Sequence, residues 1–457
     1  MNMGAAESAT LETVHLRREL RLVDLIFFNV LAVLGVQLIP SFAHVGPVAI
    51  PLHIIAACLF FVPCAWIVAK FSQLMPGEGG FYIWTRAAFG DWHGFVCGWS
   101  WWLSVLLFLP TLVVTAVEIA AEAMGMGHGG IASQSLWQIL GSLALLWVAV
   151  GANILGLRVS KWLGNVGGAM LYGATFMMVL ASLFVWLKGG SATSFVFDRA
   201  VTMNRVSLWA QIAFAYTGLE LGSLMGGEVR QPKKTIPRAV WISAVASTAA
   251  YILGCVSLMV VLPPGIINPM SGMVQTASVV GLKLGWPHFG SLMGVLLFGG
   301  IMGKLSTWGG GSARLPFAAG LDGALPVAFT RIHPVWGTPW IALLFQGVVC
   351  SLFVVLTQAG ETVRNGWQLL MDMEILASFV PFIYIFLMAC KFREYWSGVA
   401  GFVITLVAMG FAVLPPEGNP APWLFEMKVI GGCVLLLTLG AVAYWWAKRR
   451  SNPVRSL

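Results

Sequence analysis

The sequence contains about twelve separate apolar runs, each near the ~20 residues that an α-helix needs to cross ~30 Å of hydrocarbon. Continuous runs of this kind exclude a membrane β-barrel, whose strands alternate apolar and polar residues. With 58% hydrophobic and 10% charged residues, the chain is also too apolar for a soluble domain. We therefore predict an all-α integral membrane protein whose helices begin near Asp24, Val48, Gly94, Ser135, Leu163, Val206, Ala239, Gly290, Pro339, Gln368, Gly398 and Leu424.

Lysine and arginine are concentrated in alternate loops. If the N-terminus is cytoplasmic, 19 of the 26 lie in inner segments, six lie outside, and Lys304 lies within a run. The positive-inside rule then places both termini in the cytoplasm. Topology and contact with anionic lipid explain the net charge of +8, so it does not indicate nucleic-acid binding. We expect the first span to act as an uncleaved insertion signal, because residues 1–23 lack a short apolar region with a cleavage site.

The loops are short, which predicts one helical bundle without a separate soluble domain. The longest outer segment, residues 263–289, contains the apolar stretch "MVQTASVVGLKLG", which we expect to form a short helix over the bundle, either as a lid or as a connector. All seven cysteines fall within or at the edges of predicted helices. This placement favours packing roles over disulfides or a metal site.

Two of the runs are interrupted. The first breaks at "VLGVQLIP", residues 33–40, where a glycine and a proline flank Gln37, and the sixth breaks at "YTGLELG", residues 216–222, which contains Gly218 and Glu220. Paired breaks five spans apart are typical of inverted-repeat transporters, whose two discontinuous helices meet at the substrate site. The alternative is that these glycines serve only close helix packing.

A broken helix frees backbone N–H and C=O groups, which membrane depth tolerates only where they line a cavity or bind something. The positive ends of half-helices suit a carboxylate, and the exposed carbonyls suit an ammonium. Because an amino acid carries both groups, the paired breaks indicate an amino acid as the substrate.

Several motifs resemble the amino acid/polyamine/organocation transporters. They are "MPGEGGFYIWTRAAFG" at residues 75–90, "GLELGSLMGGEVRQPKKTIPRAV" at 218–240, and "GLDGALP" at 320–326 followed by "GTPW". The resemblance runs in order over roughly residues 20–395. "GDWHGFVCGWSWWL" and "FLPTL" are most similar to bacterial amino acid permeases near the L-type and glutamate/GABA antiporter branches.

This resemblance implies a leucine-transporter-like fold that works by alternating access. Residues 24–395 would form a ten-helix core of two inverted halves, with helices 1 and 6 discontinuous. Residues 396–447 would add two helices, and residues 1–23 and 448–457 would form a cytoplasmic segment and a basic cytoplasmic tail.

The family pattern also implies site residues in the sixth helix. In the family, a gating aromatic precedes the glycine–hydrophobic–glutamate motif by four residues, and Phe214 holds this position before Gly218. The backbone carbonyls around Phe214, Ala215 and Tyr216 would then hold the substrate ammonium. Glu220, the carboxylate of the motif, matches a residue on the cytoplasmic side of the site.

Aromatic residues of other helices complete the implied site. The eighth-helix aromatic falls on Trp308, fourteen residues before Asp322, and the third-helix gate falls on Trp101, with Ser104 one turn further along. Aromatic rings suit gates because they are large, have few rotamers and attract an ammonium. The alternative is packing or interfacial anchoring, the usual role of most of the 21 tryptophans.

The chain departs from the family pattern at two places. The first helix usually carries glycine-serine-glycine before an aromatic, but here it reads Val33, Leu34, Gly35, with Gln37 at the aromatic position. Gln37 is therefore a candidate for a side-chain contact with the substrate. The fifth-helix segment "NVGGAMLYGATF" lacks the lysine of proton-coupled relatives, which argues against coupling by that residue.

A charge within a membrane span is costly and is a functional candidate by default. Lys304 lies four residues before Trp308 and hence on the same helical face. Its ammonium would bind a substrate carboxylate, occupy a cation site or change protonation during the cycle. The structural alternatives are snorkelling to water or a fixed ion pair with Asp372 or Glu374. Asp372 is itself a candidate for coupling.

Other polar groups carry weaker indications. Glu118 and Glu122 share a helical face near the outside, where they form either an acidic vestibule or a solvated pair. Asn153 and Asn165 are typical of hydrogen-bonding groups at helix ends, and the isolated histidines do not indicate a metal. The phosphate-loop, HExxH and GxSxG motifs are absent from the sequence, so we expect neither an enzyme nor an ATP-driven pump.

The sequence thus predicts a plasma-membrane secondary transporter for an amino acid, operating by symport or exchange, with a proton or a counter-substrate as its second partner and without a cofactor. A polyamine or other organic-cation permease is the nearer alternative, although Lys304 argues against a purely cationic substrate. A non-transporting membrane receptor is the alternative from a different class.

Overall fold

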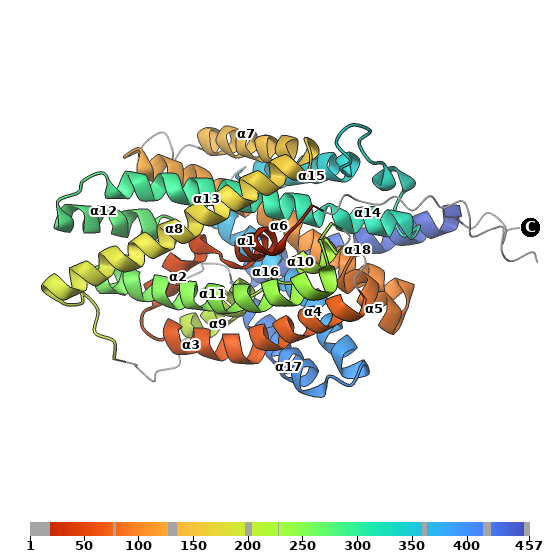
Figure 1. The fold of residues 1–457 in the computed structure, drawn as a ribbon, viewed down its shortest axis with the longest axis horizontal. Coiled ribbons are helices and arrows are strands. Elements are labelled where there is room, and N and C mark those ends of the chain that lie inside the picture. The colour runs from red at the N-terminus through yellow and green to blue at the C-terminus, as the bar shows by residue number, and fades with distance from the viewer. Residues whose placement is uncertain are drawn as a thin grey trace, which may run out of the picture.

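The computed structural model describes residues 19–75, 79–126, 135–196, 203–226, 228–358, 363–414 and 422–451. Within these residues the protein is helical, and ten segments are long and apolar enough to cross a membrane. An eleventh, shorter apolar helix covers Trp340–Leu356. The sixth predicted span falls outside this set because it is divided into two short helices. The predicted all-α membrane fold is confirmed (Figure 1).

The first five spans are formed by α1 (Leu22–Val33) with the turn η1 (Val36–Leu38) and α2 (Ile39–Val45), by α3 (Ala49–Ala56) with the π-helical turn η2 (Ala57–Phe61) and α4 (Val62–Leu74), and by α6 (Asp91–Ala123), α7 (Ser135–Ile154) and α8 (Leu157–Gly189). The short helix α5 (Phe81–Phe89) connects the second span to the third.

The next five spans are formed by α9 (Met203–Ala215) with α10 (Leu221–Leu224), by α11 (Pro232–Val261), by α13 (Phe289–Ser312) with α14 (Arg314–Leu321), and by α15 (Trp340–Gln358) and α16 (Val363–Lys391). The last two spans are α17 (Tyr395–Ala412) and α18 (Pro422–Ser451). The connectors between spans contain η4 (Pro264–Ile266), α12 (Gly272–Leu284) and η5 (Val327–Thr330).

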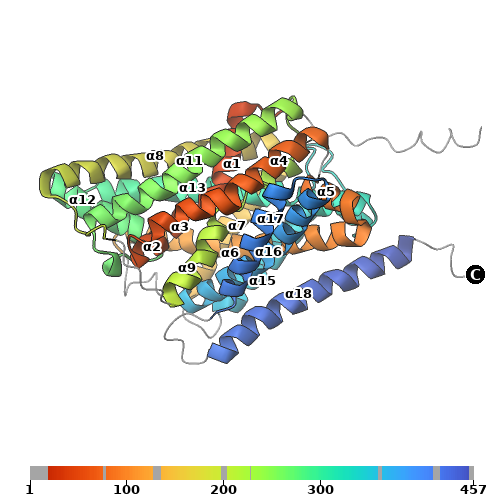
Figure 2. The ribbon, with the colours of Figure 1, turned by 90° about the horizontal axis from the view of Figure 1, so that it is seen from below.

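The connecting helices lie at opposite ends of the bundle. Helix α12 is the short helix predicted for the long outer segment, and it lies at the end opposite α5 (Figures 1 and 2). Helix α18 runs along the edge of the bundle (Figure 2). At the α5 end, Leu20 pairs with the chain after α10, accepting a hydrogen bond from Arg230 N–H and donating one to the Glu228 carbonyl. The segment before α1 is thereby tied to the segment that follows the sixth span.

A glycine pair sets the position of α13 in the centre of the bundle. A Cβ atom added to Gly167 of α8 would lie 2.6 Å from the Cα atom of Gly303, so the two backbones are in direct contact. Small residues at a helix crossing allow this approach. From α13, the next residue, Lys304, bonds Leu34 just after α1, and Trp308 one turn later bonds Ala32 within α1.

Helix α11 begins earlier than the apolar pattern indicates. The predicted start was Ala239, whereas the helix begins at Pro232. Proline is favoured in a first helical turn because the missing N–H would be unpaired there. The basic segment after the sixth span therefore belongs to α11.

Candidate functional site

The two interrupted helices meet at their breaks. Helix α1 ends at Val33, and Leu34 is extended with φ −69° and ψ 99°. The second break contains Gly218 with φ +118°, a conformation that favours glycine. A Cβ atom on Gly218 would lie 2.8 Å from the carbonyl carbon and oxygen of Ala32. The main chains of the two breaks are therefore in contact, with no side chain between them at this point.

Side chains from other helices bind the opened backbone of the first break. The Leu34 carbonyl accepts a hydrogen bond from Lys304 Nζ at 3.1 Å, and the Ala32 carbonyl accepts one from Trp308 Nε1 at 3.1 Å. The Gly35 N–H donates to the hydroxyl of Tyr251 at 2.7 Å. All three partners come from α13 or α11, so the polar groups of this break depend on tertiary contacts.

Glu220, which belongs to the second break, accepts a hydrogen bond from the backbone of that break. Its Oε2 accepts a hydrogen bond from the Gly218 N–H at 2.8 Å, and its Oε1 accepts one from Trp101 Nε1 at 3.0 Å. The residue is fully buried. A carboxylate in this position occupies the N–H group that a half-helix end offers to an anion.

The predicted gate tryptophans lie together. The rings of Trp101 and Trp308 stack with centroids 5.8 Å apart and planes inclined by 20°. Phe108 meets Trp308 edge-on at 5.0 Å, and Lys304 Nζ lies 5.4 Å from the centroid of Phe108. This aromatic group fills the space beside the breaks, and Lys304 approaches it over a ring face that attracts cations.

The carbonyls expected to hold an ammonium differ in availability. The Phe214 carbonyl already accepts the N–H and hydroxyl of Thr217 within the turn. The Ala215 carbonyl accepts the hydroxyl of Tyr251 at 3.0 Å. The side chain of Tyr216 packs against His53 and Tyr251, and its hydroxyl lies 3.2 Å from Nδ1 of His53. The carbonyls of Phe214 and Ala215 are therefore already engaged in hydrogen bonds.

Two other predicted site residues are Ser104 and Gln37. Ser104 is buried on α6 and its hydroxyl bonds the carbonyl of Trp101 at 2.7 Å. Gln37 lines a small pocket between the first break, α6, α13 and α12, together with Pro40, Met270, Ser271 and Val274 among others. Gln37 therefore faces the α12 end of the bundle, and it is not among the residues that bond Lys304.

The charges of α16 do not pair with Lys304. Lys304 and Glu374 are both buried, yet neither side chain takes part in an ion pair within 4.0 Å among the described residues. Within the same part of the chain, Glu374 Oε2 and Asp372 Oδ2 are buried without a hydrogen-bond partner. The fixed ion pair considered as an alternative for Lys304 is therefore not formed in this conformation.

Asparagines among the remaining polar candidates form hydrogen bonds between helices. Asn153 donates to the Ala149 carbonyl and accepts a hydrogen bond from Ser160, and Asn165 donates to Asp24. His44 lies 2.9 Å from the Ile267 carbonyl oxygen. Glu118 and Glu122 are half-buried at the end of α6. Among the described residues, no group of histidine, cysteine and acidic side chains has the arrangement of a metal site.

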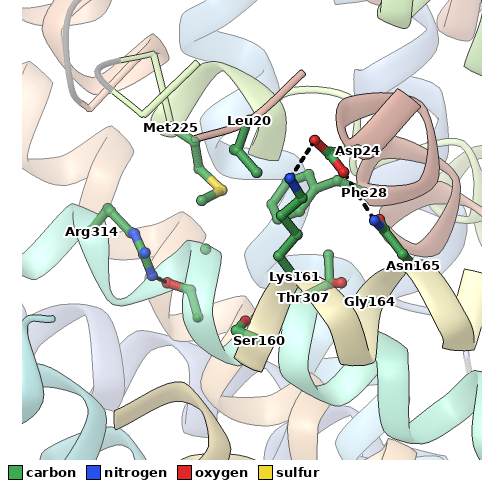
Figure 3. A pocket seen from close by; sticks show the side chains of 12 residues that line it. Leu20, Asp24, Phe28, Ser160, Lys161, Gly164, Asn165, Met225, Thr307 and Arg314 are labelled. Atoms are coloured by element: carbon green, nitrogen blue, oxygen red, sulfur yellow. Dashed lines mark hydrogen bonds and ion pairs between the residues drawn. The ribbon is translucent and has the colours of Figure 1, made fainter. Parts of the chain in front are cut away.

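A small cavity lined by both polar and apolar residues lies near the start of α1. It is lined by residues of α1, α8, α13 and α14, including Ser160, Gly164, Thr307, Gly310 and Arg314 (Figure 3). Asp24 at its edge pairs with Lys161 at 2.7 Å and accepts a hydrogen bond from Asn165 at 2.9 Å.

A second ion pair lies beside this cavity. Arg314 pairs with Glu228 at 2.9 Å, and both side chains are about 95% buried (5% and 4% exposed). Periodicity and motif spacing gave no signal for either ion pair, because each joins segments distant in the sequence. The pairs tie α1 and the segment after α10 to α8 and α14.

Tyr251 and His53 were also missed from the sequence. Their signal was weak, because each is a single polar aromatic residue within an otherwise apolar run. His53 is fully buried and stacks on Tyr251 with ring centroids 5.3 Å apart. The two residues pack together beside the breaks, where Tyr251 bonds Gly35 and His53 contacts Tyr216.

Comparisons with known proteins agree with this architecture. The amino acid permease family matches residues 20–451. The chain is 25% identical to an uncharacterized transporter of Legionella pneumophila, over 97% of this chain and 99% of that protein. It is 23% identical to a probable agmatine/putrescine antiporter of Lactococcus lactis, over 85% and 86%.

A third relative is the serine/threonine exchanger of Bacillus subtilis, 25% identical over 69% of this chain and 70% of that protein. The family match covers nearly the whole chain, and it includes both helix breaks and the helices that bind them. The chain therefore belongs to the amino acid permease family of membrane transporters.

Proposed function

We propose that the chain binds an amino acid zwitterion at the two helix breaks and carries it across the membrane by alternating access. The observation that supports this most directly is the pair of charged groups already on the breaks. Lys304 places an ammonium on the Leu34 carbonyl, and Glu220 places a carboxylate on the Gly218 N–H. These are the two charged groups that an amino acid carries.

In this proposal the substrate replaces these internal partners. Its ammonium takes backbone carbonyls of the breaks, and its carboxylate takes the N–H group of Gly218 in place of Glu220. Exchange of one hydrogen-bonded partner for another leaves few buried polar groups unpaired, which would otherwise cost about 1–3 kcal/mol each. Trp101, Trp308 and Phe214 act as gates, and Ser104 and Gln37 line the path.

Lys304 then has a role both when the site is empty and when substrate is bound. When the site is empty, its ammonium satisfies the first break, and when substrate is bound, it is free to face the substrate carboxylate. Glu374 and Asp372 are candidates for its coupling partner, because each holds a buried oxygen without a hydrogen-bond partner among the described residues. We propose the second transported species to be a proton or a counter-substrate.

The charge pattern and the family support a proposal for the cellular setting. We propose that residues 24–395 form the transport core in the plasma membrane, that residues 396–447 form two accessory helices, and that both termini are cytoplasmic. The bias of lysine and arginine toward the inner loops supports this orientation. The cavity near Asp24 would then lie at the cytoplasmic end.

The test is a ligand screen followed by transport. Purified protein in detergent is heated with each of the twenty amino acids, putrescine, agmatine and cadaverine, and the ligands that raise the melting temperature are assayed for uptake and counterflow in proteoliposomes. We expect amino acids to bind and to be transported. Binding restricted to diamines, or no transport of any binding amino acid, would contradict the proposal.

Carriage of an organic cation is the second candidate. It is favoured by the buried Glu374 carboxylate, whose Oε2 lacks a hydrogen-bond partner among the described residues, because such an oxygen suits a cationic amine. A relative named for agmatine and putrescine supports the same reading. Stronger stabilisation by putrescine than by every amino acid would favour this candidate.

A further inference from the structure

The hydroxyl of Tyr251 contacts both helix breaks. Tyr251 lies on α11 and is fully buried, and its oxygen accepts the Gly35 N–H at 2.7 Å. The same oxygen lies 2.8 Å from the Val33 carbonyl oxygen and 3.0 Å from the Ala215 carbonyl oxygen. One phenol group on a third helix therefore joins the two broken helices.

This hydroxyl can satisfy only one of the two carbonyls at a time. A phenol has a single O–H proton to donate. Among the hydrogen bonds of the described residues, no other donor reaches the carbonyl of Val33 or of Ala215. One carbonyl oxygen thus keeps unused acceptor capacity where the breaks face each other. An ammonium group, with three donors, matches such an acceptor.

The ring of Tyr251 is held so that its hydroxyl cannot swing away. His53 stacks on the ring with planes inclined by 18°. Phe42 and Tyr216 meet it edge-on, with centroids 6.1 and 5.5 Å away. Tyr216 is in turn bonded to His53. Residues from α2, α3 and the second break therefore fix the hydroxyl at the junction.

We propose that Tyr251 is a positioning residue for transport, which aligns the two breaks and leaves one carbonyl, of Val33 or Ala215, for a primary ammonium of the substrate. This inference rests on the proposed amino acid function and adds the group that selects the amine. The hydroxyl also occupies the space beside the first break, since a Cβ atom on Gly35 would lie only 3.2 Å from it. An N-methyl group on the substrate would meet this oxygen.

The experiment compares primary with N-methylated amines. Proteoliposomes containing the full chain are assayed for uptake of L-alanine, L-serine, L-glutamate and L-arginine, with the N-methyl derivative of each as a competitor. We expect the wild-type protein to prefer the parent compound by at least about tenfold. In Tyr251→Phe, we expect the KM of the parent to rise about tenfold and the preference to fall below about threefold.

The preference ratio separates positioning from general damage to the fold. A residue needed only for stability would weaken the parent and the N-methyl compound equally, so an unchanged ratio in Tyr251→Phe would overturn the inference, as would a wild-type protein without the preference. Failure of every amino acid would instead overturn the proposed function.

Two further variants complete the test. Tyr444→Phe removes a hydroxyl from another buried tyrosine, on α18, and is expected to keep both KM and the ratio. Gly35→Ala crowds the Tyr251 hydroxyl without removing it, and it decides the question if Tyr251→Phe does not fold. We expect Gly35→Ala to lower the same ratio, and an unchanged ratio would count against the inference.

Discussion

The indole N–H of Trp101 donates a hydrogen bond to Glu220 Oε1 across 3.0 Å. This contact joins the tryptophan of α6 to the break between α9 and α10. Both residues are buried, and the other carboxylate oxygen of Glu220 holds the Gly218 N–H. One carboxylate therefore contacts both the proposed gate residue and the backbone of the break.

Trp101→Phe is expected to lower transport at least about tenfold, because a buried carboxylate loses a donor whose absence costs about 1–3 kcal/mol. Initial uptake rates per folded protein in proteoliposomes measure the effect. Trp102→Phe is the matched control, since Trp102 is equally buried and its indole donates to Gln346, away from the breaks. Equal loss of uptake in both variants would show that ring packing, and not the Glu220 contact, is responsible.

Lys304→Met is expected to abolish substrate binding or coupling while leaving the protein folded. Methionine fills similar volume, and no ion pair within 4.0 Å is broken in the described part of the chain. The melting temperature should change little, because removal of a buried charge offsets the loss of the hydrogen bond to the Leu34 carbonyl. Lys283→Met, at an exposed lysine of α12, is the control. Uptake and pH dependence equal to wild type would exclude Lys304 from the mechanism.

Gly218→Ala is expected to disrupt the site more than an ordinary glycine replacement. The added Cβ atom would meet the Ala32 carbonyl at 2.8 Å, and φ of +118° is strained for any residue with a side chain. Uptake should fall to background, with a lower melting temperature. Gly173→Ala within α8 has no atom near its added Cβ and should be neutral or stabilising by up to about 1 kcal/mol. Normal uptake by Gly218→Ala would argue against close contact of the breaks.

Glu228→Gln is expected to destabilise the protein by about 3–5 kcal/mol, because it leaves the buried Arg314 guanidinium without its counter-charge. Differential scanning fluorimetry in detergent measures the change. The double variant Glu228→Gln with Arg314→Met should recover most of the loss. If the single variant melts like the wild type, the ion pair does not hold this end of the bundle.

The exposed ion pair between Lys70 and Glu394 provides a pH-dependent contrast. Hydrogen bonds from Lys70 and Trp66 hold the pKa of the Glu394 carboxyl below its usual range. A depressed pKa in the folded state gives stability that is present above the unfolded pKa and is lost as pH falls.

Between about pH 6 and about pH 4, the melting temperature of the wild type should therefore fall further than that of Glu394→Gln. The difference should correspond to less than about 1 kcal/mol, because Lys70 is 41% exposed. Parallel melting curves for the two proteins over this range would contradict a stabilising role for the pair.

The spans and both breaks were readable from the sequence because lipid leaves few choices for the backbone. Each apolar run must be a helix, and "VLGVQLIP" and "YTGLELG" carry residues that stop one. The short helix α12 was predicted for the same local reason. The exact start of α11 was not, because a proline in the first turn extends the helix beyond the apolar run.

The side chains that hydrogen-bond the opened backbone could not be predicted from the local sequence. Gly35 and Tyr251 lie 216 positions apart, and Leu34 and Lys304 lie 270 apart. Hydropathy gave Lys304 as an unusual charge and could not say that it would bond a carbonyl in place of pairing with Glu374. Nor did it separate Tyr251 from tyrosines that only fill space.

The sequence by itself determined that this protein is a helical membrane bundle with two interrupted spans, since helix formation in lipid depends on the local run of residues. Only the tertiary structure decided which side chains satisfy the interruptions. Those contacts depend on how α6, α11 and α13 pack around the breaks. Packing brings together residues that lie far apart in the sequence, so no local pattern predicts their contact.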